Sequence, residues 1–260
     1  MTERSLLFGV PIDLETFPQA VEHCTALIAE RRPVQHVVIN AGKVVMMQDQ
    51  PQLRDAVAGC EVIHADGQSI VWAGRLAGLA VPERVAGIDL MQALLGVCEE
   101  SGWPVYFLGA TDDVLTRFVT VVQERYPKLT IAGHRNGYFT DDAAVADAIA
   151  QSGARVLFVG ISSPRKELLL RDHLAEMGRV FAMGVGGSFD VLSGMTPRAP
   201  IWMQRSGLEW FFRLIQEPRR LASRYIVGNS RFAVLAAREA VAQRTARTHT
   251  ADANTKEGLG

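Results

Sequence analysis

Short apolar runs alternate with longer segments whose apolar residues recur at helical spacing along most of the chain. The runs that predict strands are LLFGVPI (6–12), HVVIN (36–40), EVIHA (61–65), VYFLG (105–109), LTIAG (129–133), RVLFVG (155–160) and VFAMGVG (180–186). Strands that are buried on both faces of a parallel sheet are apolar throughout, and helices usually connect them. The pattern therefore predicts an α/β fold, with a mainly parallel sheet covered by helices on both faces.

Capping residues mark the start of two of the predicted helices. Segment 111–126 begins with Thr111 and two aspartates, and its apolar residues then follow one helical face. Segment 140–153 begins in the same way with Thr140 and ends at a glycine. A side-chain oxygen at the N-cap and acidic residues in the first turn both stabilise a helix N-terminus. Both segments are therefore predicted to be helices.

The pattern changes at Pro197, beyond which prolines and aromatic residues punctuate short helical pieces without strand signals. We predict three parts: an α/β core over 1–197, a basic helical appendage over 198–247 and a disordered polar tail over 248–260. The aromatic and apolar side chains of the appendage include Trp202, Trp210, Phe211, Phe212, Ile215 and Tyr225.

The composition is that of an ordinary soluble protein, with 48% hydrophobic and 21% charged residues in 260. No run of about 18 uncharged apolar residues occurs, and the first residues lack the features of a signal peptide. We therefore expect a cytoplasmic protein. Cys24, Cys60 and Cys98 are widely spaced in apolar segments, which favours reduced core thiols over a disulfide or a zinc site.

Charge is unevenly distributed along the chain. Residues 1–197 contain 16 Lys and Arg against 23 Asp and Glu, whereas residues 198–247 contain 10 Arg against 3 Glu. A basic module of this kind indicates an anionic partner. The candidates are a nucleic acid, a phospholipid surface and a phosphorylated substrate.

One carboxylate lies where an apolar strand is predicted to end. In VIHADGQS (62–69), Asp66 follows the strand run, and Gly67 interrupts the pattern before helical spacing resumes. In open α/β sheets, ligands bind outside the carboxyl ends of the strands. These residues alone leave three interpretations of Asp66: a catalytic base, a ligand clamp or a helix N-cap.

Three predicted strands end in glycine, within FLGA (107–110), FVGISSPRKE (158–167) and MGVGGSFD (183–190). Free backbone N–H groups near a helix start suit a phosphate, although each glycine is also explained by a tight turn without a ligand. The motifs G-x-G-x-x-G and G-x-x-x-x-G-K-[ST] do not occur, which disfavours a dinucleotide dehydrogenase and a P-loop enzyme.

Searches for metal ligands and nucleophiles find no Asp-x-Asp pair and no H-E-x-x-H, C-x-x-C or G-x-S-x-G motif, so we predict no metal and no cofactor. His64 and His134 lie near predicted strand ends, where they could approach a ligand. His23, His36 and His173 are predicted to lie on helix surfaces or segment edges.

Several short blocks together carry a family resemblance. They are VVINAGKVV (37–45), ADGQSIVWAGR (65–75), PERVAGIDL (82–90), FLGA, NGYF (136–139), VGISSPRKE, MGVGGSFDVLSG, RAPIWMQRSGLEWFFRL and EPRRLASRY. Each block is weak alone, but in this order they are specific. From about Phe8 to Tyr225 the chain resembles the bacterial glycosyltransferase family called WecG/TagA/CpsF.

The resemblance implies transfer of a sugar from a UDP-sugar, with inversion, to a saccharide on polyprenyl diphosphate in cell-surface or exopolysaccharide biosynthesis. It implies a Rossmann-like α/β core with a helical C-terminal appendage that associates with the membrane. The aspartate of the family's ADG block is its proposed base, which is Asp66 here. The predicted catalytic residues are Asp66, Asn40 and Arg84. The predicted substrate-binding residues are Gly109, Asn136, Gly160, Ser162, Ser163, Arg165, Glu167, Gly184, Gly186, Gly187, Arg213, Arg220 and Arg224.

The chain departs from the family pattern at three positions. Val38 stands where the family often has a threonine near the active site, and Ser223 stands where an arginine is common. The family's S-P-x-Q-E segment is Ser-Pro-Arg-Lys-Glu here, so Lys166 replaces a glutamine. Lys166 is interpreted either as a partner of the diphosphate or as a solvated helix residue.

Two interpretations of the whole chain remain. One is the glycosyltransferase; the other is a non-catalytic or altered-substrate nucleotide-binding protein of the same fold, to which Val38 gives weight. For the appendage, the mixture of arginines and aromatics favours a membrane surface over a nucleic acid, and a purely structural lid is the alternative. We therefore expect a cytoplasmic protein that is peripheral on the inner face of the membrane and binds no nucleic acid. The sequence leaves formation of a homo-oligomer open.

Overall fold

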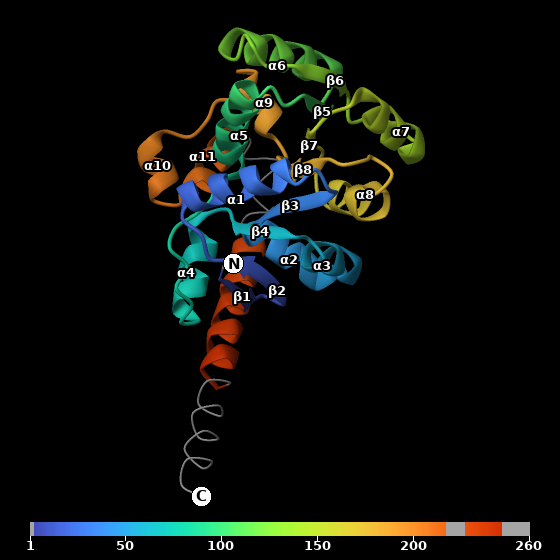
Figure 1. Ribbon diagram of the computed structural model, residues 1–260. Coiled ribbons are helices and arrows are strands. Elements are labelled where there is room, and N and C mark those ends of the chain that lie inside the picture. The colour runs from blue at the N-terminus through green and yellow to red at the C-terminus, as the bar shows by residue number, and fades with distance from the viewer. Residues whose placement is uncertain (1–2, 217–226, 246–260) are drawn as a thin grey trace, which may run out of the picture.

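The computed structural model describes residues 3–216 and 227–245 and contains a six-stranded sheet (Figure 1). The strand order is β4-β3-β8-β7-β5-β6, and every pairing in this sheet is parallel. The strands are β3 (Val34–Ile39), β4 (Val62–Ala65), β5 (Val105–Gly109), β6 (Ile131–Arg135), β7 (Val156–Gly160) and β8 (Phe181–Gly184). The predicted α/β fold with a parallel sheet is confirmed.

Helices cover both faces of the sheet, and alternate residues of each strand point to opposite faces. On β5, for example, Phe107 packs with one set of helices and Leu108 with the other. The first face carries α1 (Phe17–Ala29), α5 (Gly87–Ser101), α6 (Asp112–Arg125) and α9 (Ser188–Leu192). The second carries α2 (Ala41–Asp49), α3 (Pro51–Ala58), α4 (Gln68–Leu76), α7 (Asp142–Ser152) and α8 (Arg165–His173).

The first predicted strand is instead a hairpin outside the main sheet. LLFGVPI is divided between β1 (Arg4–Leu7) and β2 (Val10–Asp13), which pair antiparallel. Phe8 and Gly9 form the turn with φ of 55° and 78°. Two consecutive positive φ angles suit the twist of a two-residue hairpin, but Phe8 is an uncommon residue there. The continuous apolar run therefore does not indicate the turn at Phe8 and Gly9.

The capping predictions are confirmed for one helix and shifted by a residue for the other. Thr111 caps α6, where its hydroxyl accepts from the Val114 amide at 3.5 Å. The cap of α7 is Asp141 and not Thr140, because the Asp141 carboxylate accepts from the Ala144 amide at 2.9 Å. Aspartate and threonine both favour this position, so the sequence TDD does not distinguish them.

The side chains of Glu15, His64 and His36 lie in a row and are buried at β4. The sequence predicts His36 at a segment edge and His64 at a strand end where it could approach a ligand, but both rings are enclosed by the protein. Both rings are at most 1% exposed. Glu15 Oε2 lies 2.6 Å from His64 Nε2, and His64 Nδ1 lies 3.0 Å from His36 Nε2. Since an ionised carboxylate only accepts, His64 donates to Glu15 through Nε2. His134, by contrast, is exposed on β6.

Glu15 also lies 2.9 Å from the Nδ1 atom of His23 on α1. Burial alone would raise the pKa of Glu15, but the contacts with His23 and His64 lower it to about 2. The contact with Glu15 raises the pKa of His23, and burial followed by the neighbouring His64 lowers that of His36. The carboxylate therefore joins the loop after β2 to α1 and β4.

The final described helix spans residues 227–245 and packs against the N-terminal hairpin (Figure 1). The Phe232 and Phe8 rings lie 5.6 Å apart, and Arg231 pairs with Asp49 of α2 at 2.6 Å. Part of the predicted appendage thus belongs to a core cluster. The predicted tail from residue 248 lies outside the described residues.

Within residues 3–216 and 227–245, no helix is both long enough and apolar enough to span a bilayer.

Glu15→Gln is expected to remove part of the acid sensitivity of folding. The pKa of Glu15 is lowered from 4.5 to about 2, so its stabilisation is present above pH 4.5 and is lost as the pH falls toward 2. A shift of this size corresponds to about 3 kcal/mol of unfolding free energy. Urea unfolding between pH 7 and pH 2 measures it, with the exposed Glu22→Gln as control. Equal pH slopes for wild type and Glu15→Gln would contradict the assignment.

Candidate active site

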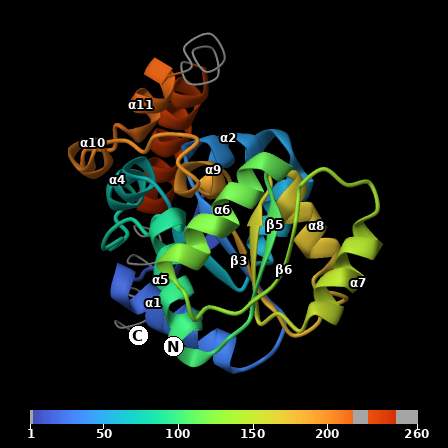
Figure 2. The same ribbon diagram turned by 90° about the horizontal axis from the view of Figure 1, so that it is seen from above.

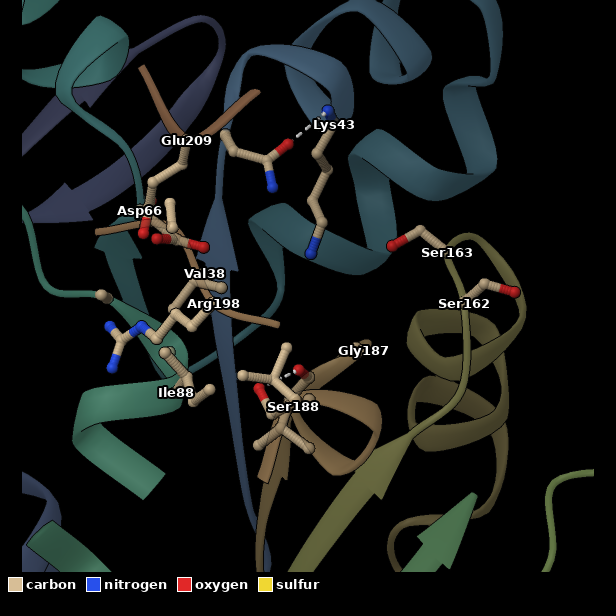
Figure 3. Close-up of a pocket in the computed structure, with 18 of the residues that line it drawn as sticks. Val38, Lys43, Asp66, Ile88, Ser162, Ser163, Gly187, Ser188, Arg198 and Glu209 are labelled. Carbon is tan, nitrogen blue, oxygen red and sulfur yellow. Dashed lines mark hydrogen bonds between the residues drawn. The ribbon is translucent and has the colours of Figure 1, made fainter. Parts of the chain in front are cut away.

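A cavity of about 580 Å³ lies at the carboxyl ends of the central strands (Figure 3). Residues after β3, β4, β7 and β8 line it, together with the segment after α9 and one side of α11 (Glu209–Gln216). Its polar lining residues are Asn40, Lys43, Asp66, Ser162, Ser163, Lys166, Ser188, Arg198 and Glu209. The core and the predicted appendage therefore build this cavity together.

The cavity lies where the chain leaves two neighbouring strands in opposite directions. β3 and β8 are adjacent in the sheet. The chain after β3 enters α2 on one face, whereas the chain after β8 enters α9 on the other. Such a divergence opens a crevice at the carboxyl edge of a parallel sheet.

Asp66 follows β4 and lines the crevice. Its backbone N–H donates to Ile39 O of β3 at 2.8 Å, and the Val85 amide donates to Ala65 O at 2.8 Å. The strand end is therefore held on two sides. The N-cap of α4 is Gly67, with φ of 109°, and no side chain caps that helix. The N-cap position is therefore occupied by Gly67, and the N-cap interpretation of Asp66 is wrong.

Two ion pairs hold the wall around Asp66. Arg198 makes a bidentate pair with Asp89 of α5, at 2.7 and 2.8 Å. The contact with Asp89, and then the charges of Glu209 and Asp66, raise the pKa of Arg198. Arg84 donates to Glu209 of α11 at 2.7 Å. The second pair ties α11 to the loop that precedes α5.

The opposite wall contains two lysines that share one buried carboxylate. Lys43 Nζ of α2 and Lys166 Nζ of α8 both lie 2.7 Å from Glu167 Oε1. Lys166 also donates to Ser163 Oγ at 2.6 Å, and that hydroxyl donates to Glu167 at 2.9 Å. Both lysines and Glu167 are at most 6% exposed. Lys166 is therefore a buried residue and not a solvated one.

Burial and the neighbouring ammonium groups shift the pKa values of Lys166 and Glu167. Burial, followed by the charge of Lys43, lowers the pKa of Lys166 to about 8. Burial would raise the pKa of Glu167, but the two ammonium groups lower it to about 2. At neutral pH the carboxylate is ionised and Lys166 is largely protonated.

The structure brings about half of the sequence-predicted residues into the cavity wall. Those that line it are Asp66, Asn40, Ser162, Ser163, Gly184, Gly186 and Gly187. Arg84 and Glu167 lie behind the wall, where they contact lining residues. Gly109, Asn136, Gly160 and Arg165 do not line it. The side chain of Arg213 and the whole of Arg220 and Arg224 lie outside the described residues.

Two predicted glycines away from the cavity are explained by packing. A Cβ on Gly109 would lie 2.5 Å from the backbone of Gly160 on the paired strand. A Cβ on Gly160 would lie 2.5 Å from the Phe189 ring. Contacts this short are forbidden, so both positions require glycine without any ligand.

The two other predicted residues outside the cavity make contacts at the surface. Asn136 donates to both carboxylate oxygens of Asp112 at 2.9 and 3.0 Å. Arg165 donates to Asp142 at 2.6 Å and lies over the Phe139 ring. These contacts order the loop between β6 and α7.

Sequence reasoning did not place Lys43, Arg198 and Glu209 in the site. Lys43 lies in the first turn of α2, where a lysine is usually solvated. Its partner Glu167 is distant in sequence, and no local pattern joins the two. The signals in the sequence were the neighbours of Lys43 in AGKVV, Gly42 and Val44, and its place in the block VVINAGKVV.

Asn40, predicted to be catalytic, has a structural contact as well as a place in the wall. Its side chain caps α2 by accepting from the Lys43 backbone amide at 3.0 Å. The cap fixes the first turn of α2, and with it the start of the Lys43 side chain.

The amino-acid sequence matches the glycosyl transferase WecG/TagA/CpsF family over residues 5–246. The match includes the whole cavity and the appendage helices. Among the described residues, no group of three or more His, Cys, Asp or Glu side chains is arranged to hold a metal ion.

Glu167→Gln is expected to destabilise the protein because it leaves two buried ammonium groups without their counter-charge. Removing one partner of a buried ion pair typically costs about 3 to 5 kcal/mol. The double variant Glu167→Gln/Lys166→Gln removes one of these charges, so it should be more stable than the single variant.

Urea unfolding at pH 7 measures these free energies, with the exposed Glu124→Gln on α6 as a matched control. A single variant as stable as wild type, or a double variant less stable than the single one, would show that Glu167 does not neutralise the lysines.

Proposed function

Because the chain belongs to the WecG/TagA/CpsF family of glycosyltransferases, we propose that it transfers a sugar from a UDP-sugar to a saccharide carried on polyprenyl diphosphate. Membership makes it a transferase with a nucleotide-sugar donor and a sugar acceptor, and supports a role in cell-surface polysaccharide synthesis. The UDP donor, the lipid-linked acceptor and inversion at the anomeric carbon are the proposed part.

The observation that carries the proposal is the carboxylate of Asp66 at a fixed strand end in this cavity. In an inverting transfer, the acceptor hydroxyl oxygen attacks the anomeric carbon while the bond to the diphosphate breaks. The bonding electrons leave with UDP, and a general base takes the hydroxyl proton. Asp66 is the proposed base. Its backbone N–H is held by β3, and the loop at Val85 holds the preceding Ala65.

The appendage completes the wall on the side of the proposed base. Figure 3 shows Glu209 and Arg198 on the same side of the cavity as Asp66. Glu209 is held by Arg84, and Arg198 by Asp89. We therefore assign Arg84 a positioning role: it fixes α11 against the core so that the acceptor enters beside Asp66.

We propose that the enzyme works on the inner face of the cell membrane, because the acceptor's prenyl tail stays in the bilayer. Large apolar side chains are exposed on three helices that lie on one flank (Figure 2): α4, α10 (Ile201–Arg205) and α11. This α4–α10–α11 patch consists of Trp72, Leu76, Ile201, Trp202, Trp210, Phe211 and Ile215, each 38% to 67% exposed. Exposed groups of this kind typically mark interaction surfaces.

The exposed patch counts against the structural-lid alternative, in which these aromatics pack on the core. Trp202 is 64% exposed and Phe211 is 41% exposed. Tryptophan is well suited to the lipid headgroup region, where its ring is half apolar and half polar. No nucleic acid is required by this proposal.

Asp66→Asn is expected to lower turnover by about 100-fold or more, because the amide cannot take the proton from the acceptor hydroxyl. Affinity for UDP should change little, since the amide keeps the size of the carboxylate. Initial rates of UDP release, with a short-chain prenyl diphosphate-linked sugar as acceptor, measure the effect.

The exposed Asp113→Asn on α6 is the matched control for the loss of one carboxylate. Near-normal turnover of Asp66→Asn would remove Asp66 as the base. No UDP release by the wild type would favour the non-catalytic alternative, and UDP release that does not depend on the acceptor would favour the altered-substrate one.

The double variant Trp72→Ala/Trp202→Ala is expected to bind vesicles of anionic phospholipid at least about 10-fold more weakly than wild type. Each large side chain contributes about 1.5 to 3 kcal/mol when its apolar surface leaves water. Vesicle co-sedimentation measures binding, and Tyr138→Ala, which removes a 78%-exposed aromatic on another loop, is the control. Equal binding by the double variant and the control would exclude this patch as the membrane contact.

A further inference from the structure

The cluster of Lys43, Lys166 and Glu167 presents a surplus of positive charge to the cavity. Two ammonium groups share one carboxylate, which leaves a net charge of about +1 in a nearly dry wall. Each ammonium has three N–H donors. The contacts described above use one donor of Lys43 and two of Lys166, and both side chains line the cavity. The cluster is thus able to bind an anion.

The backbone at the end of β8 leaves space for the Lys166 side chain to reach this wall. Its stem passes the end of β8, where a Cβ on Gly184 would lie 2.8 Å from Lys166 Cε. Any larger residue at this strand end would push the lysine aside. The glycine that the sequence suggested as a phosphate contact is therefore explained as the gap through which Lys166 reaches the cavity.

The two charged walls lie on different sides of the cavity. Figure 3 shows Asp66 and Arg198 on one side, Ser162 and Ser163 on the other, and Lys43 extending into the space between them. Displacement with inversion needs the base and the leaving group on opposite faces of the anomeric carbon. A donor with its sugar between the walls would place its diphosphate at the lysines and the attacking hydroxyl at Asp66.

We propose that Lys43 and Lys166 bind the diphosphate of the UDP-sugar and hold its charge as it leaves, an inference that rests on the proposed function. When the bond between the anomeric carbon and the phosphate oxygen breaks, the electron pair stays on that oxygen and the negative charge grows. Fixed ammonium groups at that point stabilise the transition state more than the ground state. The only proton transferred is the one that passes from the acceptor to the base.

Glu167 has a positioning role in this proposal. It keeps both ammonium groups within 2.7 Å of one oxygen atom and so fixes them before the donor binds. Its second oxygen, Oε2, is buried without a hydrogen-bond partner among the described residues. The carboxylate offsets only one of the two positive charges, so the other remains for the diphosphate.

The test compares uridine and UDP as ligands of the full-length protein by titration calorimetry. Lys43→Met and Lys166→Gln each remove one ammonium, and the second restores the family's amide. Each is expected to weaken UDP binding by roughly 10- to 100-fold, the usual effect of losing a charge-assisted hydrogen bond. Uridine carries no phosphate, so its affinity should stay unchanged. The exposed Lys128→Met is the matched control.

Two further variants separate charge from structure. Lys166→Arg keeps the charge and should retain more UDP affinity than Lys166→Gln. Gly184→Ala keeps both lysines but displaces Lys166, so it should also weaken UDP more than uridine. Inorganic diphosphate should compete with UDP for wild type and should lose affinity in the same variants.

The outcomes distinguish this proposal from the proposed function. Wild type that binds neither UDP nor a UDP-sugar would overturn the proposed function itself. Wild type that binds UDP, with unchanged affinity in both lysine variants, would overturn the diphosphate assignment alone. Equal loss of uridine and UDP would assign the lysines to the fold of the cavity. If the lysine variants lost affinity for UDP-glucuronate alone, with UDP and UDP-glucose unaffected, the lysines would be assigned to a carboxylate on the sugar. This result and an equal loss of uridine and UDP would each reject the proposal.

Discussion

A parallel sheet that is buried on both faces leaves its strand ends as the main place for polar chemistry. The six strands are covered by helices on each side, and their interior side chains are almost all apolar. Polar residues gather where β3, β4, β7 and β8 end, because the chain there diverges to opposite faces. The position of the cavity follows from this constraint, and so does the fact that one edge of the sheet contains both a carboxylate and two lysines.

Two buried carboxylates show how the fold accommodates polar groups that do lie inside. Glu15 joins the loop after β2 to β4 and α1 through His64 and His23, and Glu167 joins α8 to α2 through Lys43. In both cases nearby cationic or histidine groups outweigh the cost of burial, and the pKa of the carboxyl falls to about 2. Glu15 does not line the cavity and serves the fold. Glu167 lies behind a cavity wall, so the groups that it holds remain available to a ligand.

Local sequence patterns predicted what depends on neighbouring residues in the chain. Apolar runs located the six strands, and the rule for strand ends placed Asp66 in the crevice. The same patterns failed where the position of a residue depends on contacts that the neighbouring sequence does not indicate. The LLFGVPI run did not reveal its turn at Phe8, and nothing beside His36 indicated that it lies against His64.

The site residues follow the same division. Lys43 looks like a solvated helix residue until the fold brings Glu167 beside it. Arg165, which the resemblance implies to bind substrate, pairs with Asp142 and does not line the cavity. Gly109 and Gly160 are each required by a close approach of backbone or side chain, whereas Gly184 lines the cavity and leaves space for the Lys166 stem. A glycine at a strand end therefore indicates crowding first, and a ligand only when a lining residue supports it.

The helix α11 links the cavity to the outer surface through its two sides. Glu209 and Phe212 line the cavity, whereas Trp210, Phe211 and Ile215 belong to the exposed patch. Gly207 lies between α10 and α11, and a Cβ there would lie 2.9 Å from Gln68 of α4. The turn that joins α10 to α11 is therefore packed against α4. With eight residues, α11 is about two turns long, so both sides belong to one short segment. If this surface contacts lipid as proposed, a movement of the patch on α11 also moves Glu209, because both belong to the same helix. The ion pair between Glu209 and Arg84 couples that movement to the loop before α5.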